Sequence, residues 1–253
     1  MTSPEQAPLS EAAAQRDTII FIPAWNEAEN LPAVFQDIAE HVPGADVLVV
    51  DDGSTDDTAA VARNHGAEVL SFGHNRGLRA AIAAGYTYAN GHGYAYCGRL
   101  DGDGQHPADE LARLLADVRA GRCDVAVGSR FIPGEDGAGD RYRLHGARRV
   151  GTAVMRGAMR ALMQQPFHDP MSGMYAVNRD GMALLAQPYT SEAPEVEALL
   201  RISEAGLRLE EVPVQMRPRA SGESKLVGRK AVGVVVTVAG ALWMARRLML
   251  RGR

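Results

Sequence analysis

Cysteine, aromatic residues and long apolar runs are all scarce in this chain. Only two cysteines occur, Cys97 and Cys123, which disfavours a disulfide framework or a cysteine-rich metal site, so we expect two isolated buried thiols and a reducing compartment. The longest run of low polarity, Ala231–Ala245, is shorter than the ~20 apolar residues that a spanning helix needs. Since a signal-peptide pattern is also missing, we expect a cytoplasmic protein that contacts the inner face of the plasma membrane at most peripherally.

A surplus of positive charge is missing too, because the formal net charge is −4. A broad nucleic-acid surface is therefore not expected. The 253 residues, 46% of them hydrophobic and 23% charged, suit one large α/β domain or two small ones. We expect a disordered tail over residues 1–17, one domain over 18–226 with halves at 18–128 and 129–226, and an apolar helix over 227–253.

Short apolar segments rich in β-branched residues alternate with segments whose apolar residues recur at helical spacing. In the first half this predicts strands over Thr18–Pro23, Asp46–Val50, Glu68–Ser71, Tyr94–Leu100 and Asp124–Gly128, and helices over Leu31–Val42, Thr55–Asn64, Leu78–Asn90 and 107–121. In the second half it predicts a basic helix over Arg141–Gln164, a strand over Gly173–Asn178, a helix over Glu195–Ala205, a strand over Arg208–Val214 and a helix over Leu226–Leu250. The alternation indicates an α/β fold, a mostly parallel sheet with helices on both faces.

One polar turn, Asp101-Gly102-Asp103-Gly104-Gln105-His106, follows a predicted strand and precedes a helix. Its two carboxylates and its amide oxygen are hard ligands that suit Mg²⁺ or Mn²⁺ when a substrate diphosphate supplies the remaining ligands. Three more polar turns, Pro23–Glu27, Asp51–Ser54 and Asn75–Gly77, also follow predicted strands. Ligands bind at the carboxyl ends of parallel strands, so we expect at least the first two of these and the acidic turn to meet at one rim.

In this order the turns resemble the motifs of glycosyltransferase family 2, with Trp25 where tyrosine is usual. The matching segments are Pro23–Leu31, Val50–Asp56, Asn75–Leu78 and Asp101–His106. The later segments Val127–Phe131, Asp169–Gly173 and Arg219–Leu226 are similar to segments of polyprenyl- and dolichyl-phosphate sugar synthases, which transfer mannose or glucose. The resemblance covers roughly residues 18–230. It implies a GT-A (Rossmann-like) fold and inverting transfer from a nucleotide sugar.

The resemblance also implies roles for single residues. Those that would line the donor pocket are Pro23, Ala24, Asn26, Glu27, Asp51, Asp52, Arg76 and Gly102, with the two aspartates facing the base or ribose. Asp103 and Gln105 would bind the metal, and Asp101 would bind the nucleotide or assist the metal. Arg130, Arg219 and Lys225 would hold phosphates, and the loop from Arg219 to Lys225 has the composition of a mobile lid.

The acceptor decides whether the reaction needs a general base. A phosphate monoester has a second pKa of about 6 and is already a nucleophile at neutral pH. A hydroxyl acceptor needs a base within reach, for which Asp169, Glu195 and Glu197 are candidates. The arginines that would suit an anionic acceptor are Arg141, Arg143, Arg148 and Arg149.

Structural roles stay open for several of these residues. Asp169 could fold its own loop through bonds to the backbone. Asp51 and Asp52 could cap the helix that follows them. His106 could simply lie next to the first residue of the following helix. The C-terminal helix could pack on the core, on a partner such as a second copy of the chain, or on an anionic membrane.

The resulting prediction is a metal-dependent, inverting enzyme that moves one sugar to a polyprenyl phosphate. Processive polysaccharide synthases usually carry a Gln-x-x-Arg-Trp segment and several spanning helices, which this sequence lacks. The alternative is the same donor chemistry on a soluble acceptor in natural-product or glycoconjugate biosynthesis. Two other functions are disfavoured. A sugar-phosphate nucleotidyltransferase would need a glycine-rich, lysine-bearing loop after the first strand, and Pro23–Asn30 is not such a loop. A catalytically silent nucleotide-sugar sensor would not need an intact acidic turn. GDP-mannose, UDP-glucose and UDP-N-acetylglucosamine all remain candidate donors.

Overall fold

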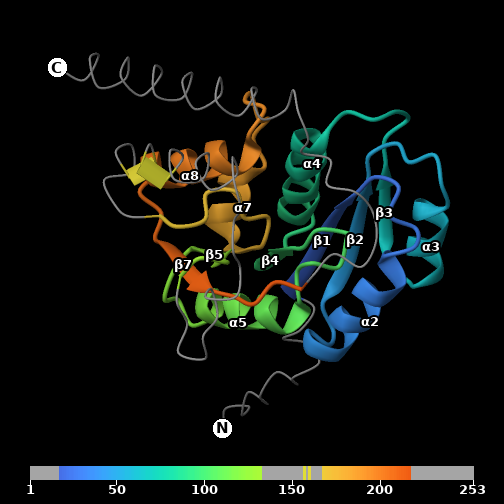
Figure 1. The fold of residues 1–253 in the computed structure, drawn as a ribbon, viewed down its shortest axis with the longest axis horizontal. Helices are drawn as coiled ribbons and strands as arrows, with labels where there is room; N and C mark the ends of the chain where they lie inside the picture. The colour runs from blue at the N-terminus through green and yellow to red at the C-terminus, as the bar shows by residue number, and fades with distance from the viewer. Residues whose placement is uncertain (1–16, 133–155, 158, 161–166, 218–253) are drawn as a thin grey trace, which may run out of the picture.

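The computed structural model describes residues 17–132, 156–157, 159–160 and 167–217. These residues build one seven-stranded sheet with helices on both faces (Figure 1). The strands are β1 (Thr18–Ala24), β2 (Asp46–Asp51), β3 (Glu68–Ser71), β4 (Tyr96–Arg99), β5 (Val125–Ser129), β6 (Tyr175–Asn178) and β7 (Leu209–Pro213). The helices are α2 (Leu31–His41), α3 (Thr58–Asn64), α4 (Leu78–Gly91), α5 (Ala108–Arg119), α7 (Arg179–Leu185) and α8 (Pro194–Glu204).

The strand order across the sheet is β3-β2-β1-β4-β6-β5-β7. All neighbouring pairs are parallel except those of β6, which runs antiparallel to both β4 and β5. The carboxyl ends of the parallel strands therefore share one edge of the sheet with the beginning of β6. We call this edge the carboxyl rim.

Both faces of the sheet are covered, which explains the nearly continuous apolar runs in its strands. Along β1, Ile19 and Phe21 face one core while Ile20 and Ile22 face the other. The first core is closed by α4, α7 and α8, and the second by α2, α3 and α5. Figure 1 shows α4, α7 and α8 on one side of the sheet and α2 and α5 on the other.

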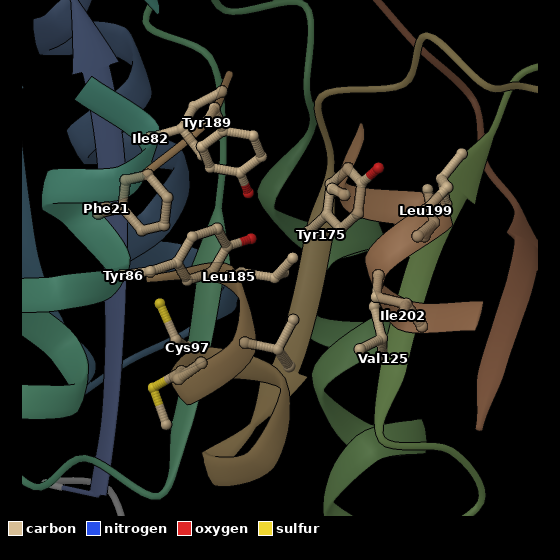
Figure 2. Packing of buried hydrophobic residues seen from close by; sticks show 14 of the residues in the cluster. Phe21, Ile82, Tyr86, Cys97, Val125, Tyr175, Leu185, Tyr189, Leu199 and Ile202 are labelled. Carbon is tan, nitrogen blue, oxygen red and sulfur yellow. The ribbon is translucent and has the colours of Figure 1, made fainter. Parts of the chain in front are cut away.

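The core beneath α4, α7 and α8 is rich in aromatic side chains. Figure 2 shows Phe21, Tyr86, Tyr175 and Tyr189 gathered between the sheet and these helices. The rings of Phe21 and Tyr86 meet edge to face, with centroids 4.8 Å apart. Gly85 permits this contact, because a Cβ at that position would lie 2.3 Å from Cδ2 of Phe21. Close packing of α4 on β1 fixes where the chain that precedes α4 reaches the rim.

The predicted fold class, a mostly parallel sheet covered on both faces, is confirmed. The two cysteines are free and buried, as expected. Helix α3 begins at Thr58 and not at Thr55, because the N–H of Thr58 bonds to the side chain of Asp56 while that of Thr55 bonds to Asn26. The bonds to these two side chains hold the preceding residues in a turn.

Two further elements differ from the prediction. Strand β4 is shorter than Tyr94–Leu100, and α7 was not predicted at all. Helix α7 spans only two turns, which is too short for a clear apolar period. Its start is marked by Asn178, whose side chain accepts a hydrogen bond from the N–H of Gly181 at 3.0 Å.

Several predictions fall outside the described residues. These are the tail up to residue 16, most of the basic helix Arg141–Gln164, the loop with Arg219 and Lys225, and the C-terminal helix over 227–253. Among the helices of the described ranges, none combines the length and the apolar character needed to span a bilayer.

Candidate active site

Hydrogen bonds join the loop after β1 to the loop after β2. Asn26, whose φ is +55°, donates its backbone N–H to Oγ of Ser54 at 2.9 Å and accepts the N–H of Thr55 through Oδ1 at 2.8 Å. Asparagine tolerates this left-handed conformation better than most residues do. The N–H of Glu27 donates to Oγ1 of Thr58 at 2.9 Å. The first two polar turns are therefore one rigid unit.

Asp51 and Asp52 at the end of β2 are almost fully buried. Oδ1 of Asp51 accepts the N–H of Ser54 at 3.0 Å. The two carboxylate oxygens of Asp52 accept the backbone N–H groups of Arg76 at 2.6 Å and Gly77 at 2.9 Å. Neither aspartate caps α3, so their bonds organise the rim loops, and Asp52 attaches the third polar turn to the second.

The acidic turn (residues 101–106) connects β4 to α5. Oδ1 of Asp103 accepts the N–H of Gln105 at 3.0 Å, and Oδ2 accepts a bond from Nε2 of Gln105 at 3.3 Å. Gly102 packs on the first loop, because a Cβ there would lie 3.2 Å from Cγ of Glu27. A larger residue at this position would push the acidic turn away from the loop after β1.

Asp101 lies between several groups that fix its carboxylate. Its Oδ1 is 3.6 Å from a guanidinium nitrogen of Arg99, and its Oδ2 is 3.8 Å from Nε2 of His106. The backbone N–H of Asp101 donates to Nδ1 of His106 at 3.0 Å, so the proton of the neutral imidazole is on Nε2 and faces the carboxylate. A Cβ on Gly173 would lie 2.8 Å from Oδ2 of Asp101, so the loop before β6 packs directly on this group.

The charges around Asp101 shift two pKa values. The enclosed position of Asp101 would by itself raise its pKa, but the positive charges of His106 when protonated, Arg99 and Arg130 outweigh this and lower it. Burial lowers the pKa of His106 despite the nearby carboxylates. At neutral pH Asp101 is therefore an anion beside a neutral imidazole.

Where β5 ends and the chain approaches β6, Arg130 and Asp169 form a two-pronged ion pair. Nε of Arg130 donates to Oδ2 of Asp169 and an η-nitrogen donates to Oδ1, both at 2.7 Å. The buried carboxylate of Asp169 also accepts the backbone N–H of Arg130 at 3.1 Å. Glu211 on β7 then accepts the N–H groups of His168 at 2.8 Å and Asp169 at 2.6 Å. Asp169 thus connects its own loop to the end of β5.

The two glutamates at the start of α8 are also paired with arginines. Oε1 of the buried Glu195 accepts a bond of 3.0 Å from Arg99. Glu197 accepts bonds from the N–H groups of Ser191 and Thr190 and from Arg201. Partial burial would raise the pKa of Glu197, but these hydrogen bonds outweigh burial and the pKa is lowered.

The predicted meeting of the polar turns at one rim is observed. Asn26 joins the first turn to the second, Asp52 joins the second to the third, and Gly102 packs the acidic turn on the first. The chain after β7 arrives there as well, because the N–H of Arg217 donates to the carbonyl of Gln105 at 2.9 Å. Arg219 and Lys225 lie beyond the described residues, so their predicted roles stay predictions.

The family model of glycosyl transferase family 2 matches residues 19–182, which is most of the described sheet. The chain belongs to this family. It is similar to polyprenol monophosphomannose synthase of Mycolicibacterium smegmatis, with 33% identity over 83% of this chain and 81% of that protein. It is also 31% identical to undecaprenyl-phosphate mannosyltransferase of Micrococcus luteus, over 92% of this chain and 98% of that protein. This glycosyltransferase of family 2 is thus an enzyme that uses a nucleotide-sugar donor.

Solved structures agree on the fold. The family 2 chain superposes on glucosyl-3-phosphoglycerate synthase of Mycobacterium tuberculosis, crystallised with Mn²⁺, uridine diphosphate and glucosyl-3-phosphoglycerate, with a TM-score of 0.67. Sequence identity is 20%, and the match covers 94% of this chain and 86% of that one. At this identity the likeness establishes the GT-A fold, which confirms the predicted architecture.

The oxygen atoms of Asp101, Asp103 and Gln105 could hold a divalent cation at the rim of this glycosyltransferase. Within the described ranges, no three His, Cys, Asp or Glu side chains form a metal cage by themselves. The donor set fits a hard dication that takes further ligands from water and a diphosphate. The side chain of Asp101 is 38% exposed, which leaves it reachable from solvent.

Two groups that organise the site of this family 2 chain were not predicted from the sequence. Arg99 was given no role from the sequence, yet it is the partner of Glu195 and lies beside Asp101. Its signal was a lone charge at the end of an otherwise apolar segment, two residues before Asp101. Glu211, which holds the loop of Asp169, gave no local signal because its partners lie more than 40 residues away.

Proposed function

We propose that this glycosyltransferase moves one sugar from a nucleoside-diphosphate sugar to a polyprenyl phosphate, with inversion and with help from a divalent metal ion. The observation that carries the proposal is the state of the three candidate general bases. Asp169, Glu195 and Glu197 each accept hydrogen bonds from an arginine, Arg130, Arg99 and Arg201 respectively.

A carboxylate occupied in this way is a poor proton acceptor for a hydroxyl acceptor, whereas a phosphate needs none. A phosphate monoester is mostly a dianion above its second pKa of about 6. Its oxygen can attack the anomeric carbon directly, forming the new C–O bond while the bond to the nucleoside diphosphate breaks. The electron pair leaves with the diphosphate, and no proton has to be moved.

The donor side supports the same reaction. Asn26, Asp51 and Asp52 hold the loops where the resemblance puts the nucleotide, and Asp101, Asp103 and Gln105 would hold the metal ion. When bound, the ion would neutralise charge that grows on the departing diphosphate. Arg130 stands at the rim on the acceptor side, where its guanidinium could add a contact to a phosphate.

The names of the similar proteins point to the same acceptor class. Polyprenol monophosphomannose synthase and undecaprenyl-phosphate mannosyltransferase both act on a lipid phosphate by their names. A mannose donor is therefore the first to test, with UDP-glucose and UDP-N-acetylglucosamine beside it.

The test is a transfer assay with the purified full chain, Mn²⁺ and each labelled donor. One acceptor is undecaprenyl phosphate in detergent, and its matched control is undecaprenol, which differs only by the phosphate. We expect label in the organic phase with the phosphate and none with the alcohol, and we expect chelation of the metal to stop the transfer. The Asp103→Ala variant should lose the transfer as well.

Other outcomes would overturn the proposal. Equal transfer to undecaprenol would show that a general base operates in this site. Label that enters only a water-soluble product would replace the lipid phosphate by a soluble acceptor. Full turnover of Asp103→Ala would remove this residue from the metal site.

A further inference from the structure

Arg99 is an unusual residue for its position. It lies on β4 with 3% of its side chain exposed, on the face of the sheet that α4, α7 and α8 cover. Its strand neighbours in register are Phe21 on β1 and Tyr175 on β6, both fully buried in the aromatic core of Figure 2. The guanidinium lies 6.0 Å from the centre of the Tyr175 ring. An apolar side chain would fit these surroundings without removing a charge from water.

The contacts of Arg99 lead to both halves of the rim. The same η-nitrogen lies 3.0 Å from Oε1 of Glu195 on α8 and 3.6 Å from Oδ1 of Asp101 in the acidic turn. Arg99 is the last residue of β4 and Asp101 lies two residues further on, so this contact joins the end of the strand to the acidic turn. Arg99 is thus the group through which α8 contacts the carboxylate of the acidic turn.

We infer that Arg99 is a positioning residue, which holds the carboxylate of Asp101 in the orientation that a divalent cation and a diphosphate require. The inference rests on the proposed function, and it concerns a residue that touches neither substrate nor metal. Glu195 orients the guanidinium, and the guanidinium orients Asp101 from one side. His106 and Gly173 also lie against this carboxylate, and 38% of the Asp101 side chain stays exposed.

Groups that orient metal ligands are worth a measurable part of metal affinity. Removing such a partner typically weakens metal binding by about 10- to 100-fold. A purely structural ion pair would lower the stability of the fold and leave metal affinity unchanged. Metal affinity therefore separates the two roles.

The experiment measures Mn²⁺ binding to the full chain by electron paramagnetic resonance, in the presence of UDP or GDP, whichever binds the wild type. Arg99→Met combined with Glu195→Gln removes both charges of the pair and leaves neither ion buried alone. Arg99→Lys keeps the charge but loses the planar fork. Arg208→Met is the matched control, because it breaks an ion pair with Asp124 at the opposite ends of the strands.

We expect the double variant to fold and to bind Mn²⁺ at least about tenfold more weakly. Arg99→Lys should fall between it and the wild type, and Arg208→Met should bind as the wild type does. Wild-type affinity in a folded double variant would overturn the inference. If the double variant does not fold, the Arg99→Lys variant is the test. Wild-type Mn²⁺ affinity in Arg99→Lys would then overturn the inference.

The same measurement distinguishes a failure of the proposed function from a failure of the inference about Arg99. A wild-type chain that binds no Mn²⁺ with either nucleotide would overturn the metal-dependent function, and the positioning role with it. Normal binding by the wild type together with unchanged binding by the variants would overturn the role of Arg99 alone.

Discussion

At the scale of single residues, Asp52 is occupied by the protein itself. Both of its oxygens accept backbone N–H groups of the loop before α4, and 4% of the residue is exposed. A buried carboxylate with two such bonds holds the loop more firmly than the backbone preferences of the loop residues would. Whatever Asp52 contributes to donor binding, it contributes in part through the position of this loop.

Asp52→Asn should therefore weaken donor binding. Asparagine has one acceptor oxygen, and its amide group would face a backbone N–H, which leaves a buried donor unpaired at a cost of ~1–3 kcal/mol. We expect a rise in the KM for the donor with a smaller change in kcat, and a lower free energy of unfolding in urea. Asp57→Asn is the control, because Asp57 is exposed and its side chain makes no cap bond. An unchanged KM would show that the loop keeps its place without Asp52.

Asp124 gives a prediction about pH. Its hydrogen bond from Arg208 lowers its pKa to about 2, against about 3.9 in an unfolded chain. A lowered pKa stabilises the fold above the unfolded value, and this contribution is lost as the pH falls from about 4 toward 2. The shift alone would suggest ~2.5 kcal/mol, but Arg208 is 58% exposed and screened, so we expect about 1 kcal/mol.

The check is a pair of urea unfolding series on the wild type and on Asp124→Asn. The difference between their free energies of unfolding should be about 1 kcal/mol at pH 6 and smaller at pH 3. A difference that grows as the pH falls would contradict the sign of this linkage.

At the scale of elements, β7 supports His168 and Asp169 and, through them, Arg130. Glu211, with 8% of its side chain exposed, accepts the N–H groups of His168 and Asp169, and Asp169 in turn holds Arg130. The strand thus positions Arg130 through Asp169. The loop before β6 has no secondary structure of its own to replace this support.

Glu211→Gln should loosen that loop. The amide keeps one acceptor for two N–H donors, so we expect a loss of ~1–3 kcal/mol in the free energy of unfolding. If Arg130 contacts the acceptor, the KM for the lipid phosphate should rise while the KM for the donor changes little. Glu210→Gln is the matched control, because Glu210 is the exposed neighbour on the same strand. Equal effects on both KM values would show that Glu211 supports the stability of the whole fold and not the position of Arg130.

The elements also show how far the sequence could predict this molecule. Apolar periods located β1, β2, β5, α2, α4 and α5 within a few residues, because each buries a regular set of apolar side chains. The start of α3 was placed wrongly since it depends on Asn26 and Asp56, which act across loops. The direction of β6 had no local signal, because a strand of four residues, three of them buried, fits a parallel or an antiparallel neighbour equally well.

For the site, the order of the polar turns predicted that they meet, since parallel strands bring their carboxyl ends to one edge. The partners of each charge could not be predicted. Asp169 and Glu195 were candidate bases by position, and the sequence held no sign that Arg130 and Arg99 occupy them. Such pairings depend on side chains from distant elements, as between β4 and α8.

At the scale of the whole molecule, one sheet carries all the loops of the candidate site. These loops follow β1, β2, β4 and β5 and precede β6, with no break in the sheet. Binding at the rim should therefore stabilise the described fold as one unit. This connects an occupied site to the melting temperature of the entire domain.

We expect Mn²⁺ and the correct nucleoside diphosphate to raise the melting temperature together far more than either does alone, because each supplies ligands that the other needs. At a concentration 100 times the Kd, a ligand adds ~2.7 kcal/mol, which corresponds to a rise of about 5–10 °C for a domain of this size. The measurement is thermal unfolding with UDP, GDP and ADP, each with and without Mn²⁺. The base that gives the largest joint shift identifies the donor class. Equal shifts for all three bases would mean that the loops held by Asn26 and Asp52 do not read the base.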